Sequence, residues 1–429
     1  MDIGQPDPLA ARDPLIADYV LDGTVKGIPP TAKLRLADAG AQGWNLLRGD
    51  LPMPAAVLRT DIMRRNSAWM MRFVKSQGLE ICPHGKTTMA PQLWNLQLAD
   101  GAWGITVAHV QQLEVALRFG VKRVIMANQP IGKLAADACI AALETCDLHV
   151  LADSEAVVAG LAEAARRAPP KRPLKVLIEV GPMGGRTGAR TTEQALATAR
   201  AVAAAPGLVV AGVEAFEGVL SEPAAVDAFL DGLVATARAI AAESLFGTEE
   251  VLLTAGGTAF FDRIGPRFAS AELGRPVTRV LRSGCYLTHD SAGYEDQYRR
   301  MRKEAALDFP DWDLQPAMEI WAAVQSRPEP KLAILTLGKR DISYDSALPV
   351  PRFWFRPGAM DAPQPLAFHS VRGLNDQHGY CVGPENTPLQ VGDLVCFGIG
   401  HPCLTFDKWQ VILLADADYT VTGAIRTFF

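Results

Sequence analysis

A lysine and two glycine-containing segments have the residue types needed to hold a phosphate-bearing carbonyl compound. Lys86 ends an apolar run, and a desolvated lysine near other cations has a lowered pKa, which frees its amine to form a Schiff base. Glycines after apolar runs let the backbone approach an anion closely, with N–H groups directed at it. The predicted phosphate-binding residues are Gly256, Gly257, Thr258, Gly284, Cys285 and Tyr286. Each feature alone is more often a turn or a surface lysine, but together they favour a Schiff-base site on Lys86.

Two arginines are candidates for binding the anionic groups of such a compound. Arg186 lies between glycines in GGRTG (184–188), where a rigid guanidinium can meet a phenolate oxygen or a carboxylate. A basic turn residue explains Arg186 equally well. Arg282 precedes Gly284 by two residues, so both point to the same face of a strand. If that face is the inner one, Arg282 reaches a cofactor ring.

A histidine and a cysteine near the C-terminus, His401 and Cys403, have the spacing of a metal-binding pair. Residues two apart in an extended segment project from one face, so an imidazole and a thiolate can share a metal ion. Two ligands do not make a structural zinc site, but they suit a catalytic zinc with open positions. On spacing alone, an isolated histidine and a buried cysteine are the simpler interpretation. His84 and His378 are further candidates for contacting a substrate.

Eight β-rich apolar runs alternate with Ala/Leu-rich stretches whose apolar residues recur at helical spacing. The runs cover residues 79–86, 103–108, 123–128, 148–153, 175–180, 209–216, 250–256 and 278–284. This alternation predicts an α/β fold, a (β/α)₈ TIM-type barrel. Active sites on such barrels form at the C-terminal ends of the strands, and phosphate is often held after strands seven and eight. Lys86 ends the first run, and the two glycine segments follow the seventh and eighth.

The character of the sequence changes after about residue 310, where short β-type runs separated by turn residues predict a C-terminal all-β domain. We therefore expect an N-terminal segment over 1–54 that packs partly on the β-domain, a cofactor-binding barrel over 55–310, and a β-domain over 311–429 with the metal pair. The run at residues 55–60 predicts one more strand, which could precede the barrel or join the C-terminal sheet. The sequence does not decide between the two.

The bulk composition limits the classes of function. The net charge of −5 gives no basic surface for nucleic acid, and no apolar run is long enough to cross a bilayer. The N-terminus lacks a signal-peptide pattern, and seven scattered cysteines suggest reduced thiols. We expect a cytoplasmic protein that binds a small molecule and neither nucleic acid nor membrane.

Motifs along most of the chain resemble, in order, those of the D-serine dehydratase and D-threonine aldolase family of pyridoxal-phosphate enzymes. They include PHGKTTMAPQL (83–93), GGRTG, TAGGT, RSGCY, DQHGY and GHPCLTFDKW, from about residue 55 to the C-terminus. The resemblance implies a barrel of the alanine racemase type with a C-terminal β-domain, in a homodimer with its active site at the subunit interface. It implies pyridoxal 5'-phosphate on Lys86, with the phosphate at residues 257–258 and 284–286. It also implies Zn²⁺ on His401 and Cys403, and an Arg282 that faces the pyridine nitrogen as in alanine racemases.

The resemblance favours one reaction over its alternatives. The family's dehydratases carry His-x-Cys where its aldolases typically carry His-x-Asp, so Cys403 favours dehydration. Many members read KTHK after the lysine, where this chain has KTTM (86–89), and EEHG where it has DQHG (376–379). This variant resembles a bacterial subgroup of D-serine-deaminase-like amino acid deaminases, which leaves the substrate open.

The expected reaction is the conversion of D-serine, or a related D-β-hydroxy amino acid, to a keto acid and ammonia. Lys86 would take the α-proton, and zinc would ease departure of the β-hydroxyl as a Lewis acid. A D-threonine-type aldolase is the alternative, with the same cofactor and metal and glycine plus an aldehyde as products. An amino acid racemase comes third, because it needs no metal. A non-catalytic pyridoxal-phosphate carrier would not need the extra β-domain.

Overall fold

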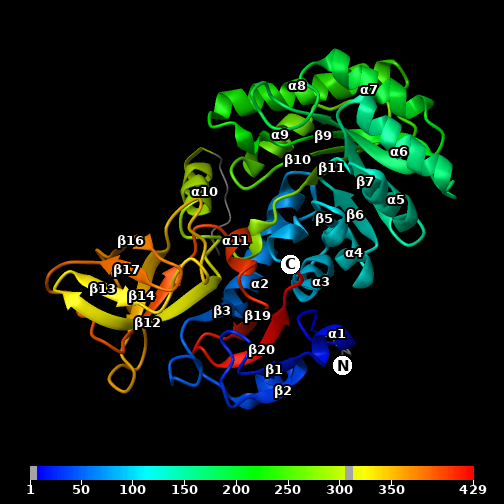
Figure 1. Cartoon of the computed structure of the whole chain (residues 1–429). Helices are drawn as coiled ribbons and strands as arrows, with labels where there is room; N and C mark the ends of the chain where they lie inside the picture. Colours follow the sequence, from blue (N-terminus) through cyan, green and yellow to red (C-terminus); the bar gives the residue numbers. More distant parts are fainter. Residues whose placement is uncertain (1–6, 305–312) are drawn as a thin grey trace, which may run out of the picture. The chain divides into compact units, whose positions relative to one another are not determined.

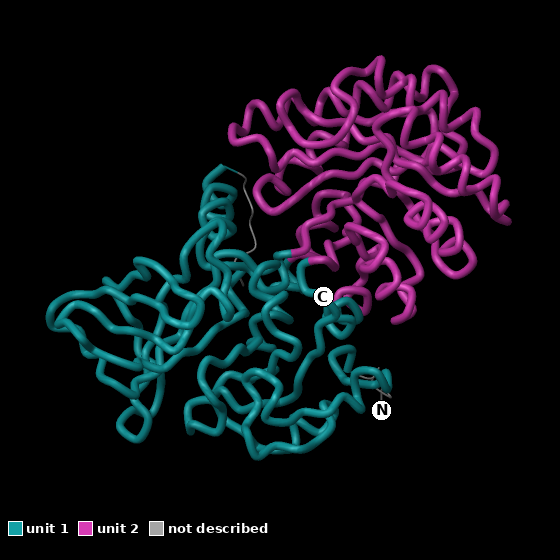
Figure 2. Tube along the Cα trace, viewed as in Figure 1, with its two compact units in different colours: residues 1–69, 87–96, 285–429 teal, residues 70–86, 97–284 magenta. Residues whose placement is uncertain are grey.

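The protein is described by a computed structural model over residues 7–304 and 313–429. The chain forms two compact units (Figure 2), here called the barrel unit (70–86 and 97–284) and the β unit (1–69, 87–96 and 285–429). The predicted boundary between residues 310 and 311 lies outside the described residues, and the predicted division at residue 54 stays a prediction. No described helix is long and apolar enough to span a membrane.

The barrel unit contains one parallel sheet of eight strands in the order β4-β11-β10-β9-β8-β7-β6-β5. The strands are β4 (Glu80–Ile81), β5 (Ile105–Val107), β6 (Arg123–Met126), β7 (Asp147–Ala152), β8 (Leu174–Val180), β9 (Leu208–Ala215), β10 (Val251–Ala255) and β11 (Val277–Leu281). The His84–Thr106 bridge pairs the chain after β4 with β5 and closes the sheet on itself. All eight predicted runs are therefore strands, and the predicted barrel is confirmed.

The interior of the barrel is packed by a layer of side chains, one from each of seven strands or strand ends. The layer consists of Cys82, Ile125, Leu151, Leu177, Ala211, Leu252 and Val280. Arg282 follows Val280 by two residues and so projects to the same inner face.

Helices connect the strands, and they form where the apolar residues recur at helical spacing in the sequence. The α-helices of the barrel unit are α4 (Val110–Arg118), α5 (Lys133–Ala142), α6 (Glu155–Arg167), α7 (Thr192–Ala204), α8 (Pro223–Ala242) and α9 (Ile264–Phe268). Figure 1 shows α5 to α8 along the outside of the sheet. In α7 the Thr191 side chain accepts a hydrogen bond from the Gln194 N–H, which satisfies one of the unpaired donors of the first turn. Two further helices, α2 (Thr60–Ser76) and α3 (Pro91–Ala99), have residues in both units.

The β unit is built mainly of antiparallel sheet. Its strands are β1 (Val20–Asp22), β2 (Lys33–Arg35), β3 (Ala55–Arg59), β12 (Met318–Glu329), β13 (Leu332–Leu335), β14 (Val350–Phe355), β15 (Gln364–Pro365), β16 (Ser370–Leu374), β17 (Gly379–Val382), β18 (Leu394–Gly398), β19 (Val411–Ala415) and β20 (Val421–Arg426). The α-helices are α1 (Pro14–Ala17), α10 (Gly293–Glu304) and α11 (Cys403–Phe406). Strand β3 pairs with β12 and β19, so the run at 55–60 joins the C-terminal sheet. The predicted all-β C-terminal architecture is confirmed.

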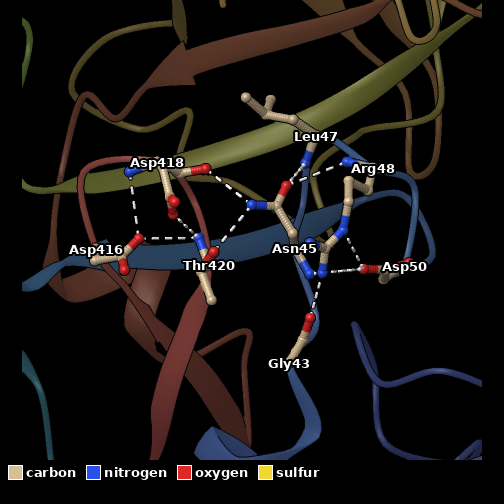
Figure 3. A network of polar contacts seen from close by, with 8 residues as sticks. All are labelled: Gly43, Asn45, Leu47, Arg48, Asp50, Asp416, Asp418 and Thr420. Atoms are coloured by element: carbon tan, nitrogen blue, oxygen red, sulfur yellow. Dashed lines mark hydrogen bonds and ion pairs between the residues drawn. The ribbon is translucent and has the colours of Figure 1, made fainter.

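Polar contacts attach the N-terminal segment to the turn between β19 and β20 (Figure 3). The Asn45 side-chain amide donates to the Asp418 carbonyl oxygen at 2.9 Å and to Thr420 Oγ1 at 3.2 Å. Asp50 accepts from the Asn45 N–H at 2.8 Å, which holds the loop before β3. Residues before β3 are thus part of the β unit, although they lie far from β20 in sequence.

Removing the Trp321 side chain should strongly destabilise the β unit. Trp321 is fully buried in β12, donates through Nε1 to Glu319 Oε2 at 3.0 Å, and packs edge-on against Tyr419. Trp321→Ala should cost about 3–5 kcal/mol of unfolding free energy, through lost burial and the cavity left behind. Urea unfolding measures the change, with Trp354→Ala, a partly exposed site in β14, as the control. Equal losses for the two variants would contradict the prediction.

Candidate functional site

The ends of three neighbouring strands bring the predicted lysine and both glycine segments to one edge of the barrel. Lys86 lies in a short 3₁₀ turn, η2 (Gly85–Thr87), which begins four residues after the end of β4. Strand β11 is the neighbour of β4, and β10 is the neighbour of β11. A Cβ at Gly284 would lie only 2.6 Å from the His84 carbonyl oxygen, so a glycine is needed where the two strand ends approach each other. The sheet order therefore groups residues that lie about 170 to 200 positions apart in the chain.

His84 is a partly exposed residue with an unsatisfied ring atom near Lys86. Burial of the ring, with the positive charges of Lys86, Arg282 and Arg186, lowers the pKa of His84 well below its usual value. Its Nδ1 is buried and has no hydrogen-bond partner among the described residues. A neutral imidazole with an unused nitrogen can donate to, or accept from, a bound ligand.

Arg282 and Glu214 form a buried ion pair inside the barrel. The Arg282 guanidinium contacts a Glu214 carboxylate oxygen and donates to Thr254 Oγ1 at 2.8 Å and to the Ala215 carbonyl oxygen at 2.9 Å. Burial raises the pKa of Glu214 to about 7, against the opposing effect of the Arg282 charge. Arg282 Nε and Glu214 Oε2 remain buried without a partner in the described part of the chain. Arg282 thus points inward, and its predicted contact with a cofactor ring stays a prediction.

The first two predicted phosphate donors already have a partner. Glu217, in a short 3₁₀ turn after β9, is fully buried. Its carboxylate oxygens accept from the N–H groups of Gly256 and Gly257, both at 2.9 Å. Gly256 has φ +98°, and a Cβ there would lie 2.2 Å from a Leu281 methyl carbon, so the turn requires glycine. A carboxylate therefore occupies the two amides that sequence patterns suggest for phosphate.

Two other predicted positions keep open donors. Within residues 7–304 and 313–429, neither the N–H of Thr258 nor that of Gly284 has a hydrogen-bond partner, and the Thr258 hydroxyl also has none. The Ser283 hydroxyl contacts the Gly257 carbonyl oxygen and so links the ends of β10 and β11. These open donors are what an anion at the strand ends requires.

The loop after β8 is held by an arginine that sequence reasoning missed. The Arg190 guanidinium donates to the carbonyl oxygens of Thr187 at 2.6 Å and of Gly188 and Gly185 at 3.0 Å. The predicted Arg186 is exposed, and its guanidinium lies 4.3 Å from the Phe216 ring centroid. Arg186 has no acidic partner among the ion pairs of the described residues, and its role toward a ligand stays a prediction.

In the β unit, the predicted metal pair lies in a cluster of polar and sulfur atoms. Cys403 Sγ is 3.5 Å from Thr87 Oγ1, which in turn is 3.9 Å from Cys285 Sγ. His401 Nδ1 is 2.6 Å from Asp345 Oδ2. The Ser343 hydroxyl accepts from the His401 N–H at 3.0 Å and fixes the backbone before α11. The two phosphate-site predictions Cys285 and Tyr286 belong to this unit, in the turn η5 (Cys285–Leu287).

The pKa values of His401 and Cys403 are shifted in opposite directions by the contacts within this cluster. Hydrogen bonds to Cys403 and then Asp345 raise the pKa of His401 to about 9. Contacts with Cys285, His401 and Thr87 hold the pKa of Cys403 well below its usual value, although burial opposes them. A thiolate is the form of cysteine that binds metal, and a metal ion would replace the imidazole proton.

The cluster fits a metal ion only in part. Among the described residues, no three His, Cys, Asp or Glu side chains converge as metal ligands. His401 and Cys403 would thus supply two ligands, one fewer than the three protein ligands common in catalytic zinc sites. His378 is exposed in the turn between β16 and β17, where its carbonyl oxygen accepts from the Asn375 N–H. Its predicted contact with a substrate stays a prediction.

Sequence reasoning missed Glu214, Glu217, Arg190 and Asp345. A signal existed for the first two, because carboxylates at the end of the apolar run VVAGVEAFEG (209–218) sit where barrel sites form. Arg190 and Asp345 gave no signal, since each acts on groups identified only after folding.

The chain is similar to a family of putative serine dehydratase domains and to proteins named as aldolases and dehydratases. Residues 317–415 match the “Putative serine dehydratase domain” family. The 3-hydroxy-D-aspartate aldolase of Paracoccus denitrificans (strain Pd 1222) is 26% identical over 373 residues, which cover 84% of this chain and 88% of the relative.

Solved structures agree in fold. The D-threonine aldolase from Filomicrobium marinum has a TM-score of 0.73 at 23% identity and covers 90% of this chain and 97% of its own. The D-threo-3-hydroxyaspartate dehydratase from Delftia sp. HT23 has a TM-score of 0.70 at 23% identity, with 90% and 99% covered. A D-threo-3-hydroxyaspartate dehydratase variant with a cysteine replaced by alanine is in a metal-free form, and a second variant replaces the histidine two positions earlier. At this identity the likeness establishes the fold alone.

Proposed function

Because the chain belongs to the D-serine dehydratase and D-threonine aldolase family, which has the alanine-racemase-like fold, we propose that it is a pyridoxal-phosphate-dependent lyase of D-β-hydroxy amino acids. The observation that carries the proposal is the order β4-β11-β10, which sets Lys86 beside the ends of the two glycine-bearing strands. Dehydration to a keto acid and ammonia is the reaction we favour.

The residues at the strand ends fit this cofactor. The open N–H groups of Thr258 and Gly284 suit a phosphate, and Lys86 suits attachment of the cofactor's carbonyl carbon. The unsatisfied Nδ1 of His84 offers a further polar contact. When bound, the cofactor supplies a conjugated ring that accepts negative charge from the substrate α-carbon.

The chain's own residues then have separate tasks. The Lys86 amine removes the α-proton, which is a general-base role. Arg282 is fixed by its contacts with Glu214, Thr254 and Ala215, which hold its guanidinium at the inner end of the site. The neutral His84 holds a substrate hydroxyl or carboxyl without adding charge.

A zinc ion on His401 and Cys403 would supply Lewis-acid chemistry to the β-hydroxyl. The two side chains have the same i, i+2 spacing as the histidine and cysteine replaced in the two D-threo-3-hydroxyaspartate dehydratase variants. Two protein ligands leave positions for water and substrate. Hydroxide is a poor leaving group. A metal ion bound to the β-hydroxyl oxygen would neutralise the negative charge that develops there as the Cβ–O bond breaks.

D-Serine is the substrate we propose first, and 3-hydroxy-D-aspartate is a related substrate suggested by the relatives. In the dehydration the Cα–H and Cβ–O bonds break and water leaves. Hydrolysis of the resulting enamine then gives the keto acid and ammonia. The homodimer with its active site at the interface and the cytoplasmic location also stay predictions.

Product analysis separates the dehydratase from the aldolase. The purified protein, loaded with pyridoxal phosphate, is incubated with D-serine, D-threonine, D-threo-3-hydroxyaspartate and their L-isomers, with and without a metal chelator. We expect a keto acid and ammonia from a D-isomer, loss of the reaction with chelator, and recovery with zinc. Glycine plus an aldehyde would establish the aldolase instead, and racemisation that survives the chelator would contradict both lyase reactions.

A further inference from the structure

We propose that Glu217 is the positioning residue of the cofactor's phosphate site, and that Thr258 and Gly284, not Gly256 and Gly257, provide its backbone donors. This inference rests on the proposed binding of pyridoxal phosphate at the barrel strand ends. It starts from an occupied pair of amides: both Glu217 carboxylate oxygens already accept at 2.9 Å from Gly256 and Gly257.

The Glu217 side chain is held in one position by burial and by two hydrogen bonds. The side chain is fully buried, and its two oxygens each satisfy one N–H, so the hydrogen bonds are charge-assisted and shielded from water. A phosphate cannot accept from these two N–H groups unless the Glu217 carboxylate first gives them up. The carboxylate would then be a buried charge without hydrogen-bond partners, which is energetically costly.

The surrounding packing leaves the two glycines little freedom. A Cβ at Gly257 would lie 2.6 Å from the Phe216 ring, and one at Gly256 would lie 2.2 Å from Leu281. The Phe216 ring also lies against Gly218, next to Glu217 in the same turn. Glu217 and Phe216 together therefore fix the backbone that leads into Thr258.

The N–H groups without a partner among the described residues belong to the backbone that follows these two glycines and to the segment after β11. The Thr258 N–H and hydroxyl and the Gly284 N–H have no intramolecular partner within the described ranges. The contact between the Ser283 hydroxyl and the Gly257 carbonyl oxygen connects the two segments. Glu217 thus acts through the loop, and not on the phosphate itself.

Amide hydrogen exchange of the wild-type chain tests the donor assignment without any substitution. The protein is labelled with ¹⁵N-glycine and ¹⁵N-threonine and compared with and without pyridoxal phosphate. The Gly256 and Gly257 amides should be equally protected in both states, whereas the Thr258 and Gly284 amides should gain protection on loading. Protection gained at Gly256 and Gly257 instead would overturn the inference.

A substitution tests the positioning role. Glu217→Gln places an NH₂ group against one of the two N–H donors, so the dissociation constant of pyridoxal phosphate should rise at least about tenfold, equivalent to about 1.4 kcal/mol. The kcat at saturating cofactor should change by less than about twofold, because Glu217 touches no reacting atom in this proposal. Glu249→Gln, an exposed carboxylate of the same unit, is the matched control and should bind as the wild type.

The outcomes are distinguishable. A wild-type chain that binds no pyridoxal phosphate overturns the proposed function. A wild type that binds it, with a Glu217→Gln variant that binds equally well or more tightly, overturns this inference alone, because Glu217 would then be indifferent to phosphate or a competitor for its donors.

Discussion

Lys86→Ala should abolish covalent attachment of the cofactor and lower the catalytic rate by about 10³-fold or more. The substitution removes both the amine that binds the cofactor's carbonyl carbon and the base that takes the α-proton. General-base catalysis alone is worth about 10²- to 10⁴-fold. The effect should appear in kcat, because the phosphate contacts do not depend on the lysine side chain.

Borohydride reduction followed by peptide mass analysis measures the attachment directly. In the wild type the reduced cofactor should be found on the peptide that contains Lys86, and in Lys86→Ala on none. Lys122→Ala, an exposed lysine in the barrel unit, is the matched control and should keep both adduct and activity. An adduct on another lysine of the wild type would contradict the assignment.

Cys403→Ala and His401→Ala should each remove the metal and with it most of the activity. The proposed site has two protein ligands among the described residues, and loss of either leaves one. We therefore expect metal affinity to fall by about 100-fold or more. Attachment of pyridoxal phosphate to Lys86 should persist in both variants, which separates the metal effect from misfolding.

Metal content after dialysis, measured by elemental analysis, is the primary readout. Cys381→Ala removes a buried thiol from β17 in the same unit and should retain the wild-type metal content. Zinc bound in equal amount by Cys403→Ala and the wild type would exclude Cys403 as a ligand. Full activity without metal in all of these variants would favour the racemase.

The sequence determined the barrel and the β-domain because both rest on local periodicity. Eight apolar runs separated by helical stretches became eight parallel strands, and Lys86 lies in the turn that follows the first of them. The run at 55–60 was recognisable as a strand, but its partners β12 and β19 lie more than 250 residues later. Strand pairing across such distances is not encoded in local spacing.

The sequence also determined which residue types could do chemistry, including the lysine, the glycine turns and the His-x-Cys pair. Only the tertiary structure decided which of their atoms are available. Gly256 and Gly257 look like phosphate donors in sequence, yet Glu217, 39 and 40 residues earlier, takes both N–H groups. In the same way Arg282 points inward because Val280 packs inside the barrel, and its partner Glu214 is 68 residues away. A hydrogen-bond donor has a limited number of acceptors, so its use is settled only when folding places every competing side chain.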